Sequence, residues 1–338
     1  MLSRRALLTT LVLASGLAYG GAARAAGGLQ ITFLNQAEAS ALMAGPGAKP
    51  YFDAMYGPEL IAKTGLDIQN FPLNIARDNA RAIYANEALE FSPEEQDVLR
   101  WGVSVLWPTL IDKAPLFARA PWKFAKVSNR IEGGLPHTRD DAIVLSSGVM
   151  DGLVSDYRAQ DLSKLYQFLG YLLAHEQTHV LQRSQPAVFA DLVNSVLGFE
   201  RVPALQSSWL SEHGVVNPDA PLNEWIYPLP GGKQGVMPYL LLDNLTHPRM
   251  PDDFRTVAVM AEKDQSRWTW VQQDGIPVTQ PLSEFKAYAN AFPNPDENYH
   301  PNEISADMLG YWLAGSTDGD ANHPLRAKLV KWAKKNLD

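Results

Sequence analysis

The amino-acid sequence predicts an α+β fold in which helices pack on a small sheet, and three observations support this class. Its 338 residues are 46% hydrophobic and 20% charged, a balance typical of globular proteins and not of disordered or fibrous ones. From Asp161 to Arg183 the apolar residues fall at helical spacing, which indicates a long, largely buried helix. The apolar run Ala142–Ser146 is bounded by Asp140-Asp141 and by Gly148, as expected of a buried strand.

The first 25 residues have the pattern of an export signal and are excluded from the fold. Ser3-Arg4-Arg5 leads into an apolar run from Ala6 to about Tyr19, and Ala23-Arg24-Ala25 supplies small residues at the spacing for cleavage. The paired arginines favour the twin-arginine route over the general secretory route. An uncleaved anchor is the alternative, but the apolar run is short for a membrane span. We therefore expect a periplasmic or secreted protein.

The charge balance and the lack of cysteine exclude several kinds of site. The formal charge is 29 − 37 = −8, and removal of the three signal arginines leaves 26 − 37 = −11. An acidic protein without a basic run is a poor nucleic-acid binder. Without cysteine, a metal would have to be held by histidine and carboxylate. Beyond the signal, no segment of the sequence is apolar for long enough to predict a membrane span.

Several elements are expected before the long helix. Residues 26–80 carry Pro, Gly and Asn at irregular intervals, which indicates a wrapping segment with short helices. Ser92-Pro93-Glu94-Glu95 predicts a helix start, because serine caps the helix, proline suits its first turn and Glu95 completes a capping box. A strand is expected at Trp122–Val127, ahead of the one at Ala142–Ser146.

An insertion is expected at about residues 184–300, within a single domain that runs from residue 26 to residue 338. Residues 209–232 are rich in Pro, Gly, Asn and Trp and predict a loop. Three short strands are expected after this loop, at Thr256–Met260, Trp268–Val271 and Ile276–Thr279. Asp274-Gly275 predicts a tight turn between the last two.

The residues with the clearest chemistry lie in the second half of the long helix. His175 and His179 are four positions apart, so both imidazoles leave the same helix face and can bind one zinc ion. Glu176 can reach a water on that ion and accept its proton. This His-Glu-x-x-His pattern on an apolar helix predicts a catalytic zinc site, because burying these side chains without a partner would be costly.

A catalytic zinc site needs a third protein ligand, and a helix expected from Asn302 to about Ala314 supplies a candidate. Glu303 and Asp307 are four positions apart on this helix. One carboxylate can therefore bind the ion while the other accepts the free N–H of a ligating histidine. We expect Glu303 as the ligand and Asp307 behind it. A solvated acidic helix face is the alternative. A last helix is expected after Pro324.

The chain resembles the gluzincin peptidases that include the bacterial heat-shock protease HtpX, the CAAX prenyl proteases and their soluble periplasmic relatives. Residues 303–310 resemble the family's Glu-x-x-Ala-Asp-x-x-Gly segment, and His175–Arg183 resembles its zinc helix. Ala142–Met150 resembles the strand that precedes this helix, and His323-Pro324 resembles the closing His-Pro segment. The resemblance implies a zincin-like (minigluzincin) catalytic domain.

The resemblance also implies a zinc metallopeptidase that acts on a polypeptide substrate. One Zn²⁺ ion per chain would be held by His175, His179 and Glu303, and Glu176 would be the general base that activates water for hydrolysis of a peptide bond. The sheet edge beside the active-site helix would bind an extended peptide as a further strand. That edge strand would consist of Ala142, Ile143, Val144, Leu145 and Ser146.

Some roles and alternatives stay open. His323 would stabilise the oxyanion, with His300 and Tyr299 as the other candidates. One alternative function is a zinc-binding chaperone or assembly factor without hydrolysis, and another is a zinc amidase that acts on a cell-wall substrate. Tryptophans in the cleft would favour a glycan, and a free strand edge would favour a peptide. The long insertion could cover the cleft. Three other histidines are expected to be structural or exposed: His137, His213 and His247.

Overall fold

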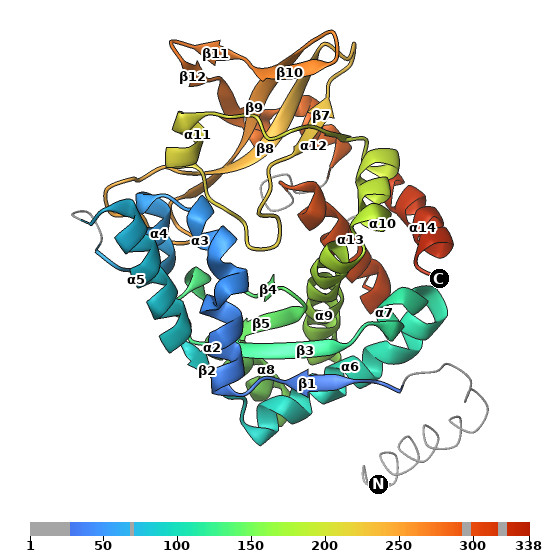
Figure 1. Ribbon diagram of the computed structural model, residues 1–338. Coiled ribbons are helices and arrows are strands. Elements are labelled where there is room, and N and C mark those ends of the chain that lie inside the picture. Colours follow the sequence, from blue (N-terminus) through green and yellow to red (C-terminus); the bar gives the residue numbers. More distant parts are fainter. Residues whose placement is uncertain (1–27, 68–70, 293–298, 317–322) are drawn as a thin grey trace, which may run out of the picture. The chain divides into compact units, whose positions relative to one another are not determined.

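The computed structural model describes residues 28–67, 71–292, 299–316 and 323–338, and it shows helices packed with small sheets (Figure 1). This arrangement confirms the predicted α+β class. The expected export signal at residues 1–25 lies outside the described residues. Within the described part of the chain, no helix combines the length and the apolar character that crossing a membrane requires.

The first sheet places β3 (Trp122–Val127) and β5 (Ala142–Ser146) side by side in parallel, at the predicted bounds. β1 and β2 pair with β3, and β4 pairs with the other side of β5 in antiparallel register. These outer strands are β1 (Ile31–Phe33), β2 (Ala88–Leu89) and β4 (His137–Arg139). Ala142–Ser146 is therefore an inner strand, paired on both sides, and its prediction as the sheet edge is wrong. The edge beside it is β4.

The strand β4 is joined to β5 by a two-residue turn, Asp140-Asp141. Arg139 pairs with Ala142, and Asp140 has a φ of 47°, a left-handed conformation that aspartate adopts more readily than most residues. The three residues of β4 are His, Thr and Arg, and all are buried. A search for apolar alternation misses such a strand, because its polar side chains are satisfied by tertiary contacts.

The N-terminal segment forms short helices, as predicted. They are α2 (Gln36–Ala44), η2 (Pro46–Ala48), α3 (Lys49–Ala54), α4 (Gly57–Thr64) and α5 (Leu73–Asn86). Their buried side chains form one cluster with residues of the first sheet, including Ala125, Val127 and Val144. The N-terminal helices therefore pack against the first sheet.

The predicted capping box at Ser92 and Glu95 is present, and α6 (Pro93–Lys113) begins there. Two shorter helices follow, α7 (Pro115–Arg119) and α8 (Ser147–Arg158). The long helix α9 (Leu162–Ser184) has the predicted extent, with Asp161 as its N-cap. α6 and α9 approach closely at Gly102, where an added Cβ would lie 2.5 Å from Leu169 Cδ2.

The two closing helices also occur where they are predicted, as α13 (Pro301–Ala314) and α14 (Pro324–Asn336). α13 packs along α9, and this pair carries the residues expected to bind metal. Between α9 and the second sheet the chain forms α10 (Pro186–Asp191) and a π-helical turn, η4 (Leu192–Val196). Trp332 of α14 donates a hydrogen bond of 2.7 Å to Asp191 and so ties the C-terminal helix to α10.

The segment expected to be an insertion, at about residues 184–300, contains a second, antiparallel sheet with the strand order β10-β9-β8-β7-β6, and β13 also pairs with β9. The strands of this sheet are β6 (Glu200–Arg201), β7 (Trp225–Pro228), β8 (Gln234–Leu242), β9 (Phe254–Asp264), β10 (Arg267–Trp270) and β13 (Thr279–Pro281). A separate two-stranded sheet consists of β11 (Gln272–Gln273) and β12 (Ile276–Pro277). The predicted turn at Asp274-Gly275 joins β11 to β12, with positive φ at both residues. The sheet is thus larger than the three short strands that were predicted.

Two predictions within the insertion need correction. Residues 209–232 are not all loop, because they include most of α11 (Ser208–His213) and all of β7. The strand β8 was not predicted, and it contains Pro238, a residue that is uncommon in strand interiors. Pairing with β7 involves Gly235 and Val236, so Pro238 lies beyond the segment of β8 that β7 covers. The insertion ends with η5 (Leu282–Glu284) and α12 (Lys286–Ala291).

A buried cluster of charged side chains joins α4 to the first sheet. Glu132 Oε1 accepts hydrogen bonds from Tyr51, Tyr84 and Arg139, at 2.5, 2.7 and 3.0 Å. Lys63 Nζ lies 3.4 Å from Glu132 and 2.9 Å from Glu59. Burial alone would raise the pKa of Glu132, but the charges of Lys63 and Arg139 outweigh burial and hold it at about 2. Glu132 therefore stays ionised, and its contact with Lys63 ties α4 to the first sheet.

The close contact between α6 and α9 can be tested with two matched substitutions. Gly102→Ala should lower stability by about 1–3 kcal/mol, because the new methyl group would overlap Leu169 and Leu173. Gly152→Ala is the control, since Gly152 is exposed in α8 and an added Cβ meets nothing within 4 Å. That control should raise stability by up to about 1 kcal/mol. Urea unfolding measures both changes, and equal effects would contradict the packing argument.

Stability should depend on pH through the buried imidazole of His137. Burial, and then the charge of Arg139, lower the pKa of His137 to about 4. The unfolded chain takes up a proton near pH 6.5 and the folded chain does not, so stability falls as the pH drops from about 6.5 towards 4. Between pH 7.5 and 5, the unmodified protein should lose about 2 kcal/mol more than His137→Asn in urea unfolding. Exposed His247→Asn is the control, and equal losses in all three proteins would refute this cause.

Candidate metal centre

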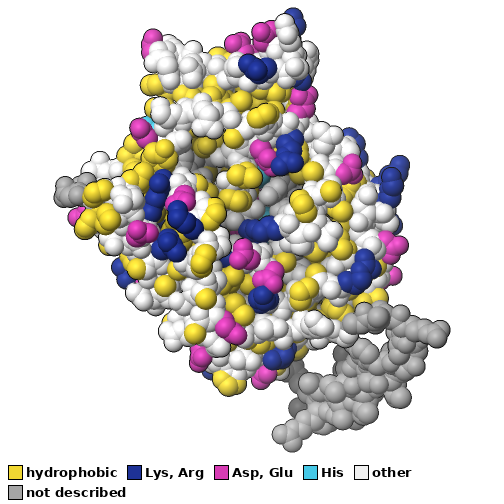
Figure 2. Space-filling view, in the orientation of Figure 1, with side chains coloured by type: hydrophobic (Ala, Val, Ile, Leu, Met, Phe, Trp, Pro, Cys, Tyr) yellow, Lys and Arg dark blue, Asp and Glu magenta, His cyan; other side chains and the backbone are white. Residues whose placement is uncertain are grey.

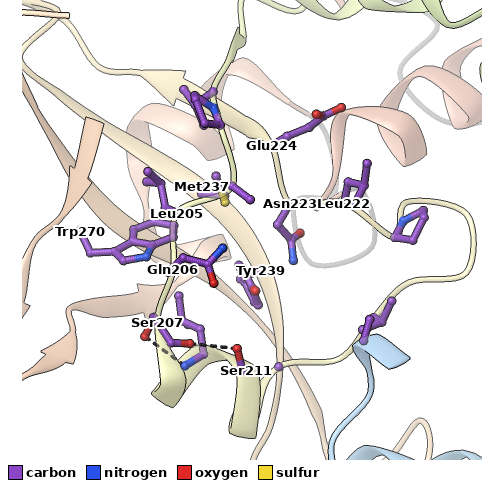
Figure 3. A pocket seen from close by; sticks show the side chains of 18 of the residues that line it. Leu205, Gln206, Ser207, Ser211, Leu222, Asn223, Glu224, Met237, Tyr239 and Trp270 are labelled. Carbon is purple, nitrogen blue, oxygen red and sulfur yellow. Dashed lines mark hydrogen bonds between the residues drawn. The ribbon is translucent and has the colours of Figure 1, made fainter. Parts of the chain in front are cut away.

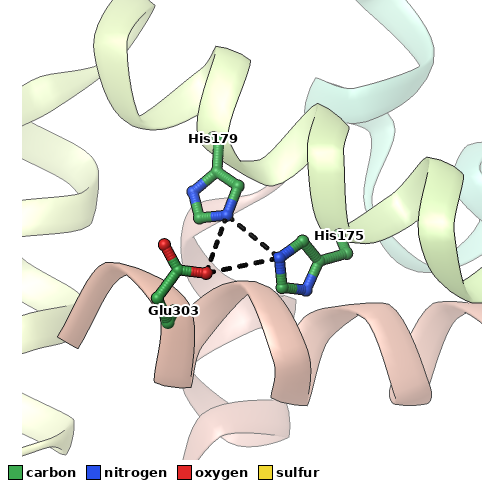
Figure 4. Close-up of side chains that lie close together, drawn as sticks. All are labelled: His175, His179 and Glu303. Atoms are coloured by element: carbon green, nitrogen blue, oxygen red, sulfur yellow. Dashed lines mark hydrogen bonds and ion pairs between the residues drawn. The ribbon is translucent and has the colours of Figure 1, made fainter. Parts of the chain in front are cut away.

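The His-Glu-x-x-His pattern lies on α9, and its two histidines face α13 one helical turn apart (Figure 4). Glu303 reaches them from the first turn of α13. The Nε2 atoms of His175 and His179 are 3.1 Å apart. Glu303 Oε2 lies 3.4 Å from the first and 3.3 Å from the second. The tertiary fold thus brings together all three predicted ligands, as a group that could hold a metal ion.

The separations of these three atoms fit a zinc ion. Zinc binds imidazole nitrogen and carboxylate oxygen at about 2.0–2.1 Å, almost always with tetrahedral geometry. Two ligand atoms of such a tetrahedron lie about 3.3 Å apart, which follows from the bond length and the tetrahedral angle. The observed separations of 3.1, 3.3 and 3.4 Å match this value. Three protein ligands also leave a fourth position, as in catalytic zinc sites.

The orientation of His179 is set by Gln182, one turn further along α9. Gln182 Nε2 donates to the carbonyl of Asn302 at 3.0 Å and to Ser305 Oγ at 2.9 Å, so its Oε1 faces the imidazole. His179 Nδ1 lies 2.9 Å from this oxygen and must carry the proton of the bond. The lone pair of the ring is therefore at Nε2, the atom that faces Glu303. Gln182 was not among the predicted site residues.

The orientation of His175 depends on two groups behind it. Asp307 Oδ1 lies 3.4 Å from His175 Nδ1, which is where the carboxylate was expected. Tyr171 lies 3.3 Å from the same nitrogen and donates its hydroxyl to Asp307. Both groups direct Nε2 of His175 towards Glu303. Tyr171 was missed, although its position four residues before His175 places it on the same helix face.

Small residues on α13 allow this close approach of the two helices. An added Cβ on Gly310 would lie 3.1 Å from Tyr171 Cδ2 and 3.3 Å from the carbonyl oxygen of Tyr171. Ser305 and Ala306 are fully buried at the same interface. Glu303 is held ionised there, because the two imidazoles outweigh burial and keep its pKa well below the usual value.

Glu176 is placed to act as a base beside the three ligand atoms. It is 3% exposed, and its Oε2 atom has no hydrogen-bond partner among the described residues. Burial, and then the charge of Asp219, raise the pKa of Glu176 to about 7. The structure thus provides a poorly solvated carboxylate oxygen that can take a proton from a molecule bound in the cavity.

A cavity of about 200 Å³ lies in front of the centre. Its polar lining includes His137, His175, Glu176, Asn217, Tyr299 and Glu303. Its apolar lining includes Leu135, Leu240, Met250 and Phe254. Figure 2 shows that this face of the molecule is hollowed near its middle. His175 and Glu303 line the cavity and keep side-chain exposures of 15% and 14%, so the candidate metal centre is not within a closed core.

The candidates for the oxyanion group occupy different places. Tyr299 lines the cavity together with Glu303. His300 is the N-cap of α13, where its Nδ1 accepts from the N–H of Asn302. His323 is the N-cap of α14, where its Nδ1 accepts from the N–H of Leu325. The described contacts bring Tyr299 to the centre and give both histidines capping roles.

The edge strand β4 faces the cleft, but the outward N–H and carbonyl oxygen of Thr138 already have hydrogen-bond partners within the chain. The N–H of Thr138 donates to Asp219 Oδ1 at 2.8 Å, and its hydroxyl donates to the same carboxylate. Arg183 donates to both the hydroxyl and the carbonyl oxygen of Thr138. Asp219 belongs to the insertion, and no local pattern in the sequence marks it or its neighbour Asn217 as part of the site.

The remaining histidines are structural or exposed, as predicted. His137 is buried with Nδ1 3.1 Å from the carbonyl oxygen of Leu135. His213 stacks on Trp209 with ring centroids 4.1 Å apart. His247 is exposed.

Comparisons with protein-family models, with curated proteins and with solved structures give no match for this chain. The chemical interpretation of the centre therefore depends on its own geometry. That geometry comprises three converging ligand atoms, a free carboxylate oxygen and an adjoining cavity.

Zinc affinity should depend on the hydrogen bond between Gln182 and His179. Gln182→Ala removes the acceptor that holds the proton at Nδ1, so we expect zinc to bind about 10- to 100-fold more weakly. Competition with a chelating dye measures this change. Gln185→Ala is the matched control, because Gln185 is exposed just beyond the end of α9. If both variants bind zinc as tightly as the unmodified protein, the hydrogen bond from Gln182 does not contribute to zinc affinity.

Proposed function

We propose that the protein is an exported zinc-dependent metallopeptidase with a zincin-like catalytic domain. The observation that carries this proposal is the convergence of His175, His179 and Glu303 at tetrahedral spacing, with a free oxygen of Glu176 beside them. Zinc binding alone does not need this carboxylate, so Glu176 favours catalysis over a purely structural metal. The signal-like residues 1–25 support export to the periplasm or beyond.

A bound zinc ion would polarise the peptide carbonyl and lower the pKa of an attacking water. In the proposed reaction, Glu176 accepts a proton from that water at Oε2 and returns it to the leaving amine. Tyr299 donates its hydroxyl to the oxyanion, since it lines the same cavity. Burial, and then the charge of Glu303, raise the pKa of Tyr299, so the hydroxyl keeps its proton at neutral pH.

The lining of the cavity favours a polypeptide over a glycan. Tryptophan is not among the described residues that line it, whereas sugar rings commonly stack on such side chains. Leu240, Met250 and Phe254 instead offer an apolar surface close to the metal ligands. We therefore propose a substrate that places an apolar side chain next to the bond to be cleaved.

Glu176→Gln should separate zinc binding from catalysis. The variant keeps all three metal ligands, so metal analysis should find about one zinc per chain, as in the unmodified protein. Hydrolysis of a fluorescent peptide library should fall by about 100-fold or more, because the amide cannot accept the proton. Glu94→Gln is the control, since Glu94 pairs with Arg158 on an exposed surface. A fully active Glu176→Gln variant would refute the mechanism.

A further inference from the structure

A segment of the insertion lies inside the cleft of the metal centre. It comprises residues 215–220, between α11 and β7, and we call it the cleft segment. Figure 1 shows this yellow loop reaching down towards β4. Val215 and Asp219 are buried, and residues 215–219 all line the cavity in front of the metal ligands. Each of residues 216–219 makes a polar contact with side chains or backbone groups that border the cleft.

The backbone of Val216 is held by two buried side chains of α4, Glu59 and Lys63. Its N–H donates to Glu59 Oε1 at 2.7 Å, and its carbonyl oxygen accepts from Lys63 Nζ at 2.6 Å. Glu59 and Lys63 are 1% and 0% exposed. These two side chains contact main-chain atoms that every residue except proline carries, so they can bind a polypeptide without regard to its sequence at that position.

Asn217 contacts the groups that the proposed reaction uses. Its Nδ2 donates to Glu303 Oε1 at 2.7 Å and to the hydroxyl of Tyr299 at 2.8 Å. Glu303 is a metal ligand, and Tyr299 is the proposed oxyanion donor. While Asn217 stays in this position, a substrate carbonyl cannot reach Tyr299 without displacing it.

Pro218 and Asp219 occupy the edge of the first sheet. Arg183 donates to the carbonyl oxygen of Pro218 at 2.6 Å. Asp219 accepts from the N–H of Thr138, the backbone group that an added strand would use. The bond from the N–H of Asp219 to Asn217 Oδ1, at 2.7 Å, folds these residues into a compact turn.

The cleft segment also separates three neighbouring cavities. The first is the 200 Å³ cavity at the metal centre, and the second, of about 300 Å³, lies along β4 and contacts Pro218. The third, of about 320 Å³, lies under the second sheet and contacts Val215 and Val216. Figure 3 shows Leu222 and Asn223 across this third cavity from Trp270. Displacement of the segment would join these spaces into a longer groove.

We propose that the cleft segment is an internal occupant of a polypeptide-binding groove, and that it must move out before a substrate binds. Glu59, Lys63, Thr138 and Arg183 would then bind the substrate backbone in place of the segment's own. This inference rests on the proposed peptidase function. It further assigns a backbone-binding subsite to the buried charged pair of α4 and a latent resting state to the protein.

The test releases the segment without changing a metal ligand. A recognition sequence for a site-specific protease is inserted between Leu222 and Asn223, where Leu222 is 62% exposed, so that the full chain folds before it is cut. The matched control carries the same insertion between Gly231 and Gly232, in the exposed turn from β7 to β8. A second variant, Asp219→Ala, removes the carboxylate between Thr138 and Arg183, and exposed Asp243→Ala is its control.

The first measurement is the rate at which the zinc-loaded protein loses its metal to excess chelator, which requires no hydrolysis. The cut protein and Asp219→Ala should lose zinc at least about tenfold faster than their controls, since the segment loses hydrogen bonds to charged groups. A synthetic peptide with the sequence of residues 214–220 should slow that loss again. If the cut protein keeps its unfolding midpoint and its original rate of zinc loss, the segment is a fixed wall and the inference fails.

The second measurement, hydrolysis of fluorescent casein by the same samples, separates this inference from the proposed function. Hydrolysis that increases together with zinc loss supports both. Faster zinc loss that the peptide reverses, without hydrolysis by any sample, supports the occupied groove and contradicts the peptidase. Hydrolysis by the uncut protein that does not increase after cutting supports the peptidase and contradicts the occupied groove.

Discussion

The packing of α13 against α9 is the contact on which the metal centre depends. Neither helix carries a complete site, since α9 supplies two imidazoles and α13 supplies the carboxylate. Gly310 against Tyr171 allows the close approach, and Gln182 bonds to the first turn of α13. The same interface therefore sets the distance between the helices and the rotation of both histidine rings. Because three ligand atoms must meet within a few tenths of an ångström, a small shift of either helix would disperse them.

The second constraint is that charged side chains are buried near the cleft and need counter-charges or hydrogen bonds. Glu132 pairs with Lys63 and Arg139 and accepts hydrogen bonds from two tyrosine hydroxyls. Glu132 and Lys63 line the same cavity as the candidate ligands His175 and Glu303. Such groups are tolerated in an interior when nearly every one has a counter-charge or a hydrogen bond. Glu176 combines burial and a carboxylate oxygen without a partner among the described residues with a place at the cavity beside the candidate ligands. A buried carboxylate oxygen without a partner lowers stability, so its presence in a cleft favours a catalytic role over a structural one.

The segment expected to be an insertion, at about residues 184–300, contributes a second sheet and a connection that enters the cleft. Its antiparallel sheet packs on its own small clusters of apolar residues, such as the one around Ile226, Met237 and Trp268. The connection between α11 and β7 instead extends into the cleft, where Asn217 donates a hydrogen bond to the candidate metal ligand Glu303. An edge strand that could bind peptide is thus present, but its outward N–H is paired within the chain. The candidate metal centre and the cleft segment that contacts it are thus held together by hydrogen bonds within one chain.

The sequence by itself determined the elements with strong local signals. These are the capped helix at Ser92, the strands β3 and β5, the zinc-type pattern on α9, and α13 with Glu303 and Asp307 on one face. It could not show that β5 is an inner strand, because β4 consists of polar residues that are buried only through long-range partners. The sequence left Tyr299 as one of three candidates for the oxyanion group, and the tertiary structure places it near Glu303. Only the tertiary structure brings Asn217 and Asp219 into the cleft. The reason is physical: helix spacing and capping act over a few residues, whereas contacts across some 80 positions depend on the packing of the whole chain.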